Sequence, residues 1–444
     1  MVAQRLSACK SDQRFIPPAY FAADPVANDY DDFFSVLNFT VVPERDESKP
    51  WPGNPPHPER AYVKAQLVMI REKLEYHTQL RRFLIKHPAL VIRLGFRPVV
   101  DPDSPWGFDV ERTVPSARHL RRKLQYGDNG VLKAILASTV ADLRDQVPGL
   151  GETISQDVKH IYAWVKENNP KTYVKDRYDP DRQPRGDPDC KLGVKRRHNQ
   201  GEEEQDEDKE FLWGYGTGIT VAKVGQDVEC VLAEHTQTFN ENDITYFRPL
   251  LEQTCANLGF HPTNLAADAA FDAWYVYEPF AQRGGLACIP LNLRGHPEPK
   301  LGPHGFHLCD DGREMVGSYV YEDRTRGYTA QVERCPLLFP EPTGEVCRIN
   351  HDQFQKGKGC VKYRNLSIGA HMRITLDRES PEYKAIYNQR TAAERINSQA
   401  VALGIERPKV RNFQSVQNRN TLIYIIINAN ALHRVRETRT RDPT

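Results

Sequence analysis

The sequence lacks a dominant charge, because its 60 Lys and Arg residues nearly balance 59 Asp and Glu residues. A balanced chain has no overall electrostatic field, so a nucleic-acid partner has to be inferred from local patches. The charge is uneven along the chain. Residues 202–210 (EEEQDEDKE) are strongly acidic, whereas residues 191–200 and the tail HRVRETRTR are basic. The acidic run is typical of a solvated loop.

Long apolar runs are also missing. The most apolar stretch, LIYIIINANAL at 422–432, is too short to span a bilayer, and the first residues lack the apolar centre of a signal peptide. These features predict a cytoplasmic protein without a membrane partner. Nine cysteines, an odd number, argue against a disulfide framework in such a protein and leave free thiols or a metal site.

Hydrophobic periodicity divides the chain into five predicted parts. Residues 1–60 are rich in Pro, Asp and aromatic residues and predict an irregular arm, whereas apolar residues recur at helical spacing through residues 61–150. The period then falls toward two, which predicts strands within residues 151–285. A cysteine-bearing segment without long helical runs follows at 286–380, and residues 381–444 predict C-terminal helices.

The strand region contains five strand candidates and one helix. The strand candidates are ETISQDVKHIYAWV (152–165), FLWGYGTGITVAKV (211–224), VECVLAEHTQTF (228–239), NLAADAAF (264–271) and GGLACIPL (284–291), and the helix is NDITYFRPLLEQTCANLGF (242–260). A charged low-complexity loop is predicted at 166–210, between the first two strands. This order predicts an α/β fold with a mixed five-stranded sheet and flanking helices.

Three carboxylates suggest a metal site. Asp157 and Asp268 occupy strand positions where a charge is costly unless it is used or solvated, and Glu394 lies in the helical pattern YNQRTAAERINSQ. Asp272 competes with Asp268, but its position fits a helix start better. If the first and fourth strands are neighbours, the three acids can converge and would need divalent cations, for which oxygen ligands favour magnesium or manganese. Two such ions roughly 4 Å apart support phosphodiester cleavage.

These residues resemble the DDE transposases of bacterial insertion sequences, whose catalytic core is RNase H-like. The strongest match is Tyr-x2-Arg-x3-Glu, present as Tyr387, Arg390 and Glu394, which would share one face of a helix, and followed by RINSQ. The segment ISQDVKHIYAW resembles the family's first-aspartate strand, with Asp157, and ADAAFDAWYVYE resembles its second, with Asp268. The resemblance covers most of the chain from about residue 61, and residues 61–150 resemble the family's DNA-binding region.

One departure concerns DNA contacts. In the fullest form of the family's signature a Lys or Arg follows the Glu by seven residues, where this chain has Val401. The corresponding contact is expected to be absent or moved to Arg407 or Lys409. Arg395 and Asn397 are weaker candidates for contacts to phosphate.

The resemblance implies a transposase that binds the terminal repeats of an insertion sequence and then cuts and joins DNA. Asp157, Asp268 and Glu394 would hold two Mg²⁺ or Mn²⁺ ions, and Tyr387 and Arg390 would contact phosphates near the cleaved end. The implied fold is an RNase H-like core, preceded by a small helical domain and interrupted by a cysteine-bearing insertion. The implied partners are double-stranded DNA, as transposon ends and target, and a second copy of the chain on DNA.

The implied location is the prokaryotic cytoplasm, in association with the nucleoid. Two alternatives remain open for the function. One is an RNase H-like nuclease that cuts without joining, and the other is a domesticated DNA-binding protein that has lost catalysis.

Four cysteines of the predicted insertion suggest a further metal site. Four thiolates can hold a tetrahedral zinc ion, with His307 and His351 as substitute ligands. No CxxC pair occurs, however, and spacings of 26, 12 and 13 residues are not a diagnostic zinc pattern. A structural zinc site and ordinary reduced cysteines are therefore both open. The four residues are Cys309, Cys335, Cys347 and Cys360.

Overall fold

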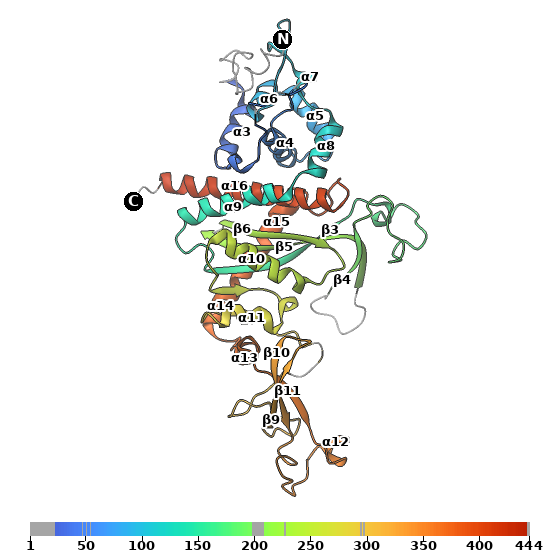
Figure 1. Cartoon of the computed structure of the whole chain (residues 1–444), viewed down its shortest axis with the longest axis vertical. Helices are drawn as coiled ribbons and strands as arrows, with labels where there is room; N and C mark the ends of the chain where they lie inside the picture. The colour runs from blue at the N-terminus through green and yellow to red at the C-terminus, as the bar shows by residue number, and fades with distance from the viewer. Residues whose placement is uncertain are drawn as a thin grey trace. The chain divides into compact units, whose positions relative to one another are not determined.

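The chain forms two compact units (Figure 1). Unit 1 comprises Met1–His261 and Thr391–Thr444, and unit 2 comprises Pro262–Arg390. The computed structural model describes residues 23–441 except 47, 50, 54, 198–207, 226–227, 294, 296 and 297. Most of the predicted acidic loop at 202–210 therefore lies outside the described residues.

Helices dominate the first part of unit 1, and the helical periodicity predicted for residues 61–150 is confirmed. The elements are α3 (Pro25–Ser35), η2 (Phe39–Val41), α4 (Glu59–Arg71), α5 (His77–Lys86), α6 (Pro88–Leu94), β1 (Val99–Val100), β2 (Phe108–Asp109), α7 (Val110–Thr113), α8 (Ala117–Tyr126) and α9 (Asn129–Gln146).

Helix α3 lies in the segment that was expected to be irregular. The Asp24 side chain accepts a hydrogen bond from the Ala27 N–H at 2.9 Å, and Pro25 occupies the first helical position. A capping acid followed by proline is a strong helix start. Tyr30 and Phe33 then bury their rings in the core. The expectation of an irregular arm was therefore wrong for this stretch, where Pro and Asp begin a helix instead of interrupting one.

An antiparallel sheet follows in unit 1, formed by β3 (Thr153–Tyr162), β4 (Lys191–Arg197), β5 (Asp208–Gly225) and β6 (Val228–Thr238). The long strand β5 pairs with the other three. Strands β3, β5 and β6 confirm the first three predicted strands. Strand β4 corrects the prediction of a loop over 166–210, whose start instead contains the short helix η3 (Lys166–Asn168).

Helices cover both faces of this sheet. On one face, η4 (Asp243–Tyr246) leads into α10 (Phe247–Leu258), and Tyr246 packs against β5. Gly216 and Gly218 make this packing feasible, because a Cβ at either position would collide with Tyr246. The other face carries α15 (Thr391–Ala402) and α16 (Phe413–Arg441), and α16 runs beside α9 (Figure 1).

Helix α16 contains the most apolar stretch of the sequence and buries it. Asn428 on this helix joins it to β6: its amide group donates to the Val231 carbonyl and its side-chain oxygen accepts from the Val231 N–H, both at 2.8 Å. A buried side chain thus satisfies both backbone groups of Val231, as a neighbouring strand would. Across the described part of the chain, no helix has the length and apolar character needed to cross a membrane.

Unit 2 begins with two short parallel strands, β7 (Asn264–Ala266) and β8 (Ala287–Cys288), which confirm the fourth and fifth predicted strands at reduced length. The remaining elements are η5 (Ala269–Phe271), α11 (Trp274–Ala281), β9 (Val316–Asp323), β10 (Tyr328–Arg334), α12 (Asp352–Gln355), β11 (Val361–Asn365), α13 (Ile368–Thr375), α14 (Pro381–Tyr387) and η6 (Asn388–Arg390). The cysteine-bearing part folds around a separate antiparallel sheet in the order β11–β10–β9. The chain is thus mixed α/β.

Candidate functional site

Asp157 lies in the middle of β3, opposite Ile219 of β5. Its carboxylate accepts a hydrogen bond from the Asn397 side-chain amide, with 2.8 Å between Nδ2 and Oδ2. Asn397 is buried on α15, and this helix packs against β3 and β5. The bond therefore joins the strand of the first predicted aspartate to the helix of the predicted glutamate, across 240 positions of sequence.

Glu394 lies in the first turn of α15 and is exposed. It precedes Asn397 by three residues, which corresponds to about 4.5 Å along the axis and the same side of the helix. Glu394 is thus a neighbour of the residue that holds Asp157. An acid in a first turn also stabilises the helix through its dipole, so this position suits both a structural and a catalytic carboxylate.

Arg395, a weaker candidate for a phosphate contact, has a structural role. Its guanidinium donates to the Glu229 carboxylate at 2.5 Å, and the Glu229 side chain is almost completely buried on β6. This ion pair fixes α15 to the sheet. Because the Arg395 guanidinium pairs with a buried acid, we assign Arg395 to the positioning of α15 and not to a contact with DNA phosphate.

Asp268 follows β7 in unit 2 and caps η5. Its Oδ1 accepts from the Ala270 N–H at 2.9 Å. Burial raises the pKa of the Asp268 carboxyl, and the backbone bond from Ala270 and the positive charge of Arg390 partly offset this effect. A carboxylate that is costly to ionise, beside an arginine, is the kind of group found at functional sites.

Asp272 differs from Asp268, although only four residues separate them. Its side chain is fully buried and accepts two hydrogen bonds from the Arg373 guanidinium, at 2.7 and 2.6 Å. It also accepts from the Tyr277 hydroxyl at 2.9 Å and from the Asn292 N–H at 2.7 Å. These contacts give Asp272 a structural role. The sequence suggested that Asp272 begins the following helix, but the residue that caps α11 is Ala273.

The segment from Tyr387 to Glu394 is not one continuous helix, so the prediction of a shared helix face was wrong. Helix α14 ends at Tyr387, η6 spans the next three residues, and α15 begins at Thr391. Tyr387 stacks on Tyr383, with 5.6 Å between ring centres, and the Arg390 guanidinium lies 5.9 Å from the Tyr387 ring centre. The break separates a helix that packs within unit 2 from one that packs within unit 1.

The cysteines of the insertion gather around one small apolar cluster. Cys335, Cys347 and Cys360 pack with Leu337, and the Cys335 N–H donates to the Cys360 carbonyl at 3.0 Å. Burial, together with the neighbouring Cys309, Cys335 and Cys347, raises the pKa of the Cys360 thiol to about 12. A reduced cysteine in such a cluster packs as a small apolar side chain.

The two histidines that were considered as substitute ligands have different partners, and only His351 contacts the cluster. His307 contacts the buried Glu333 carboxylate through Nδ1 at 2.9 Å. His351 accepts from the Phe354 N–H through Nδ1, and its Nε2 lies 3.1 Å from the Cys360 sulfur. Among the residues that the structure describes, no three His, Cys, Asp or Glu side chains are arranged to hold a metal ion. The structure therefore does not support the zinc alternative.

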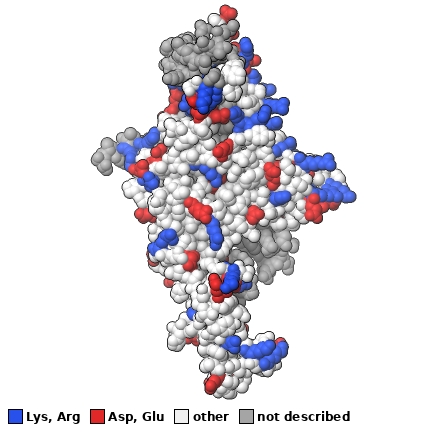
Figure 2. Space-filling model, viewed as in Figure 1, with Lys and Arg blue, Asp and Glu red and all other residues white. Residues whose placement is uncertain are grey.

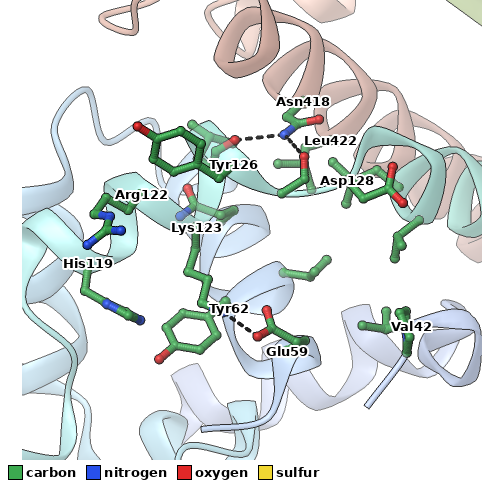
Figure 3. A pocket seen from close by; sticks show the side chains of 17 residues that line it. Val42, Glu59, Tyr62, His119, Arg122, Lys123, Tyr126, Asp128, Asn418 and Leu422 are labelled. Carbon is green, nitrogen blue, oxygen red and sulfur yellow. Dashed lines mark hydrogen bonds and ion pairs between the residues drawn. The ribbon is translucent and has the colours of Figure 1, made fainter. Parts of the chain in front are cut away.

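A pocket of about 530 Å³ opens in the helical part of unit 1 (Figure 3). Lys123 points into it, pairs with Glu59 and lies 4.7 Å from the Tyr62 ring centre. Asn418 closes one side by donating to the Leu124 carbonyl at 2.8 Å. Because Glu59 and Asp128 line the pocket together with Arg122 and Lys123, the charges of its lining balance and the pocket is poorly suited to a polyanion.

Helix α8 nevertheless presents a basic outer face. It buries Leu120 and Leu124, whereas Arg118, Arg121 and Arg122 are exposed. Figure 2 shows Lys and Arg side chains gathered on the side of the helical region where α8 lies. A helix with this division suits contact with a phosphate backbone.

Among solved structures, the chain is similar to one described as a cryo-EM structure of a piggyBac transposase synaptic complex with hairpin DNA. The identity is 10% and the TM-score 0.37, over 93% of this chain and 75% of that chain. A likeness this slight carries no argument about the fold. No curated protein matches the chain.

A family model described as a transposase DDE domain matches residues 194–429. This segment is more than half of the 444 residues and includes Asp268, Tyr387, Arg390 and Glu394, while Asp157 precedes it. The chain therefore belongs to the family of transposases with a DDE domain.

Proposed function

We propose that this transposase binds the terminal repeats of an insertion sequence and catalyses both cleavage and strand transfer. Membership in the DDE family implies phosphoryl transfer on DNA, and the family generally uses divalent metal ions. We further propose that the core is RNase H-like and that the carboxylates of Asp157, Asp268 and Glu394 form its active site.

The hydrogen bond between Asn397 and Asp157 carries this proposal. The family's order of acids requires a helix late in the chain to supply the third carboxylate next to the first strand. Here α15 packs on β3, Asn397 orients the Asp157 carboxylate at 2.8 Å, and Glu394 lies one turn away on the same helix. A buried amide that fixes the orientation of a carboxylate is a common support for a catalytic site.

The donor chemistry fits magnesium or manganese, because all three side chains offer hard oxygen ligands. Asp268 in particular is partly buried and its pKa is raised, so a nearby cation would stabilise its charged form. Bound divalent ions would supply an activated water and stabilise the leaving oxygen of the phosphodiester. The meeting of Asp268 with the other two carboxylates stays a prediction.

The remaining residues of the site are proposed to hold DNA. Arg390 offers a guanidinium beside Asp268, and Tyr387 is stacked in a fixed position next to it. Arg390 can therefore bind a phosphate near the cleaved bond. The basic face of α8 is proposed to contact the backbone of the transposon end. Two ends have to be joined, so we propose a homodimer on double-stranded DNA.

The test is cleavage and joining of a duplex that carries the element's end, in Mg²⁺ or Mn²⁺. The wild type is expected to cut and to join, and Asp157→Asn, Asp268→Asn and Glu394→Gln are each expected to do neither while retaining DNA affinity. Glu379→Gln is the matched control, because this glutamate is 86% exposed and forms a surface ion pair with Lys384. Cutting without joining by the wild type would favour a nuclease, and binding without cutting would favour a DNA-binding protein that has lost catalysis.

A further inference from the structure

A second pocket of unit 1, of about 400 Å³, opens where β3 ends. Its walls are the residues that follow β3, the short helix η3 and the segment that follows α15. We name it the Arg407 pocket after one of its four basic residues, Lys166, Arg407, Lys409 and Arg411. Within the described part of the chain, its lining includes no acidic residue.

Both arginines of the pocket are held in place by aromatic rings. The Arg407 guanidinium lies 4.2 Å from the Tyr162 ring centre, and the Arg411 guanidinium lies 4.6 Å from the Trp164 ring centre. A guanidinium stacked on a ring keeps its N–H edges available to an anion. Because the side chains are already ordered, an anion that binds there loses little affinity to their immobilisation.

Two acids near the pocket, Glu406 and Glu210, are fewer than its four basic residues. The Glu406 carboxylate forms an ion pair with Lys159 at 2.6 Å, and the Glu210 carboxylate accepts from the Tyr162 hydroxyl at 3.0 Å. The larger pocket of unit 1 differs in this respect, because Glu59 and Asp128 are part of its lining. The Arg407 pocket therefore keeps an excess of positive charge that suits a polyanion.

The pocket is fixed to the strand that carries Asp157. The Tyr162 N–H donates to the Glu406 carbonyl at 2.8 Å, so the segment after α15 runs along the end of β3. Tyr162 follows Asp157 by five residues in the same strand, a separation of about 17 Å.

We propose that the Arg407 pocket binds backbone phosphates of duplex DNA that flank the bond that is cleaved. This inference rests on the proposed function, because it takes the DNA to be cut beside Asp157. The pocket contacts phosphates only, so it contributes affinity and register without reading base sequence.

The test is the salt dependence of binding to a duplex that carries the element's end. The variant Arg407→Ala/Arg411→Ala is expected to lower the slope of log K against log salt by about 1.8, at about 0.9 for each phosphate contact that is lost. The matched control is Lys171→Ala/Lys175→Ala, which removes two exposed charges from the loop after η3, outside the pocket lining. The control is expected to leave the slope unchanged.

The conservative variant Arg407→Lys keeps the charge but lacks the planar group that stacks on Tyr162, and it is expected to weaken binding while preserving the slope. Both arginines are exposed, so thermal unfolding of the double variant should match the wild type. If the wild type neither binds nor cleaves the duplex, the proposed function fails. If the wild type does both and the double variant keeps the slope of the control, only the Arg407 pocket is refuted. If the double variant lost affinity for single-stranded RNA but kept its affinity for duplex DNA, the proposal for the Arg407 pocket would also be overturned.

Discussion

The Asp272 cluster of unit 2 and the contact between β3 and α15 in unit 1 both contain acids, but these acids differ in burial and in hydrogen bonding. Asp272 is fully buried and is surrounded by Arg373, Tyr277 and Asn292. In the other region, Asp157 is half-buried and Glu394 is exposed. Removing a partner from Asp272 would leave a buried charge uncompensated, whereas Asp157 and Glu394 are solvent-accessible, as the proposed catalytic role requires.

The largest expected effect is on the accessible acids. Asp157→Asn and Glu394→Gln should each reduce DNA cleavage by about a thousandfold, because each removes one charged ligand from the proposed metal site. Neither should change the free energy of unfolding by more than about 0.5 kcal/mol, since Glu394 is exposed and Asn at 157 can still accept a hydrogen bond. Cleavage rates and urea unfolding measure the two quantities. If either variant lost much stability but cleaved DNA at an unchanged rate, its acid would be structural, like Asp272.

The opposite pattern is expected in the Asp272 cluster. Arg373→Met should lower the free energy of unfolding by about 3–5 kcal/mol, because it leaves the buried Asp272 charge without its partner. Lys384→Met breaks the exposed pair with Glu379 and should cost less than about 1 kcal/mol. Urea unfolding of both variants tests the difference. Equal losses would mean that the cluster is no more than a surface ion pair.

The support for Asp157 should have an intermediate effect. Asn397→Ala removes the group that orients the carboxylate and should reduce cleavage by about 10–100-fold. The concentration of Mg²⁺ needed for half-maximal cleavage should rise at the same time. An unchanged Mg²⁺ requirement together with a lower unfolding free energy would show that Asn397 supports only the packing of α15.

A small change in stability is expected at Asp268, in addition to the loss of cleavage. Burial raises its pKa, so the folded chain holds this proton more tightly than the unfolded chain, and ionisation at neutral pH lowers stability. Asp268→Asn should therefore increase the free energy of unfolding at pH 7 by about 0.5–1 kcal/mol without divalent ions. The gain should disappear as the pH falls through the folded pKa. A loss of stability at pH 7 would place Asp268 with Asp272 among the structural acids.

The sequence predicts the elements whose pattern is local. Helices α4 to α6 and strands β3, β5 and β6 follow from apolar spacing alone. Strand β4 was not predicted, because KLGVKRR is charged and becomes a strand only by pairing with β5. The helix break at Asn388–Arg390 was also missed, since it depends on α14 and α15 packing in different units.

The candidate site shows the same division. Asp157, Asp268 and Glu394 could be selected from their sequence neighbours, but their partners could not. The bond from Asn397 spans 240 positions and the pair of Asp272 with Arg373 spans 101, so only the fold reveals them. The sequence neighbours favoured Asp268 over Asp272, but the hydrogen bonds that enclose Asp272 could not be foreseen from them.

The most direct test of the account is a crystal structure of the protein with manganese, using anomalous scattering to locate the ions. The account predicts two ions about 4 Å apart, with carboxylate oxygens of Asp157, Asp268 and Glu394 as ligands at about 2.1–2.2 Å. Ions bound elsewhere, or a Glu394 carboxylate remote from both aspartates in that structure, would contradict it.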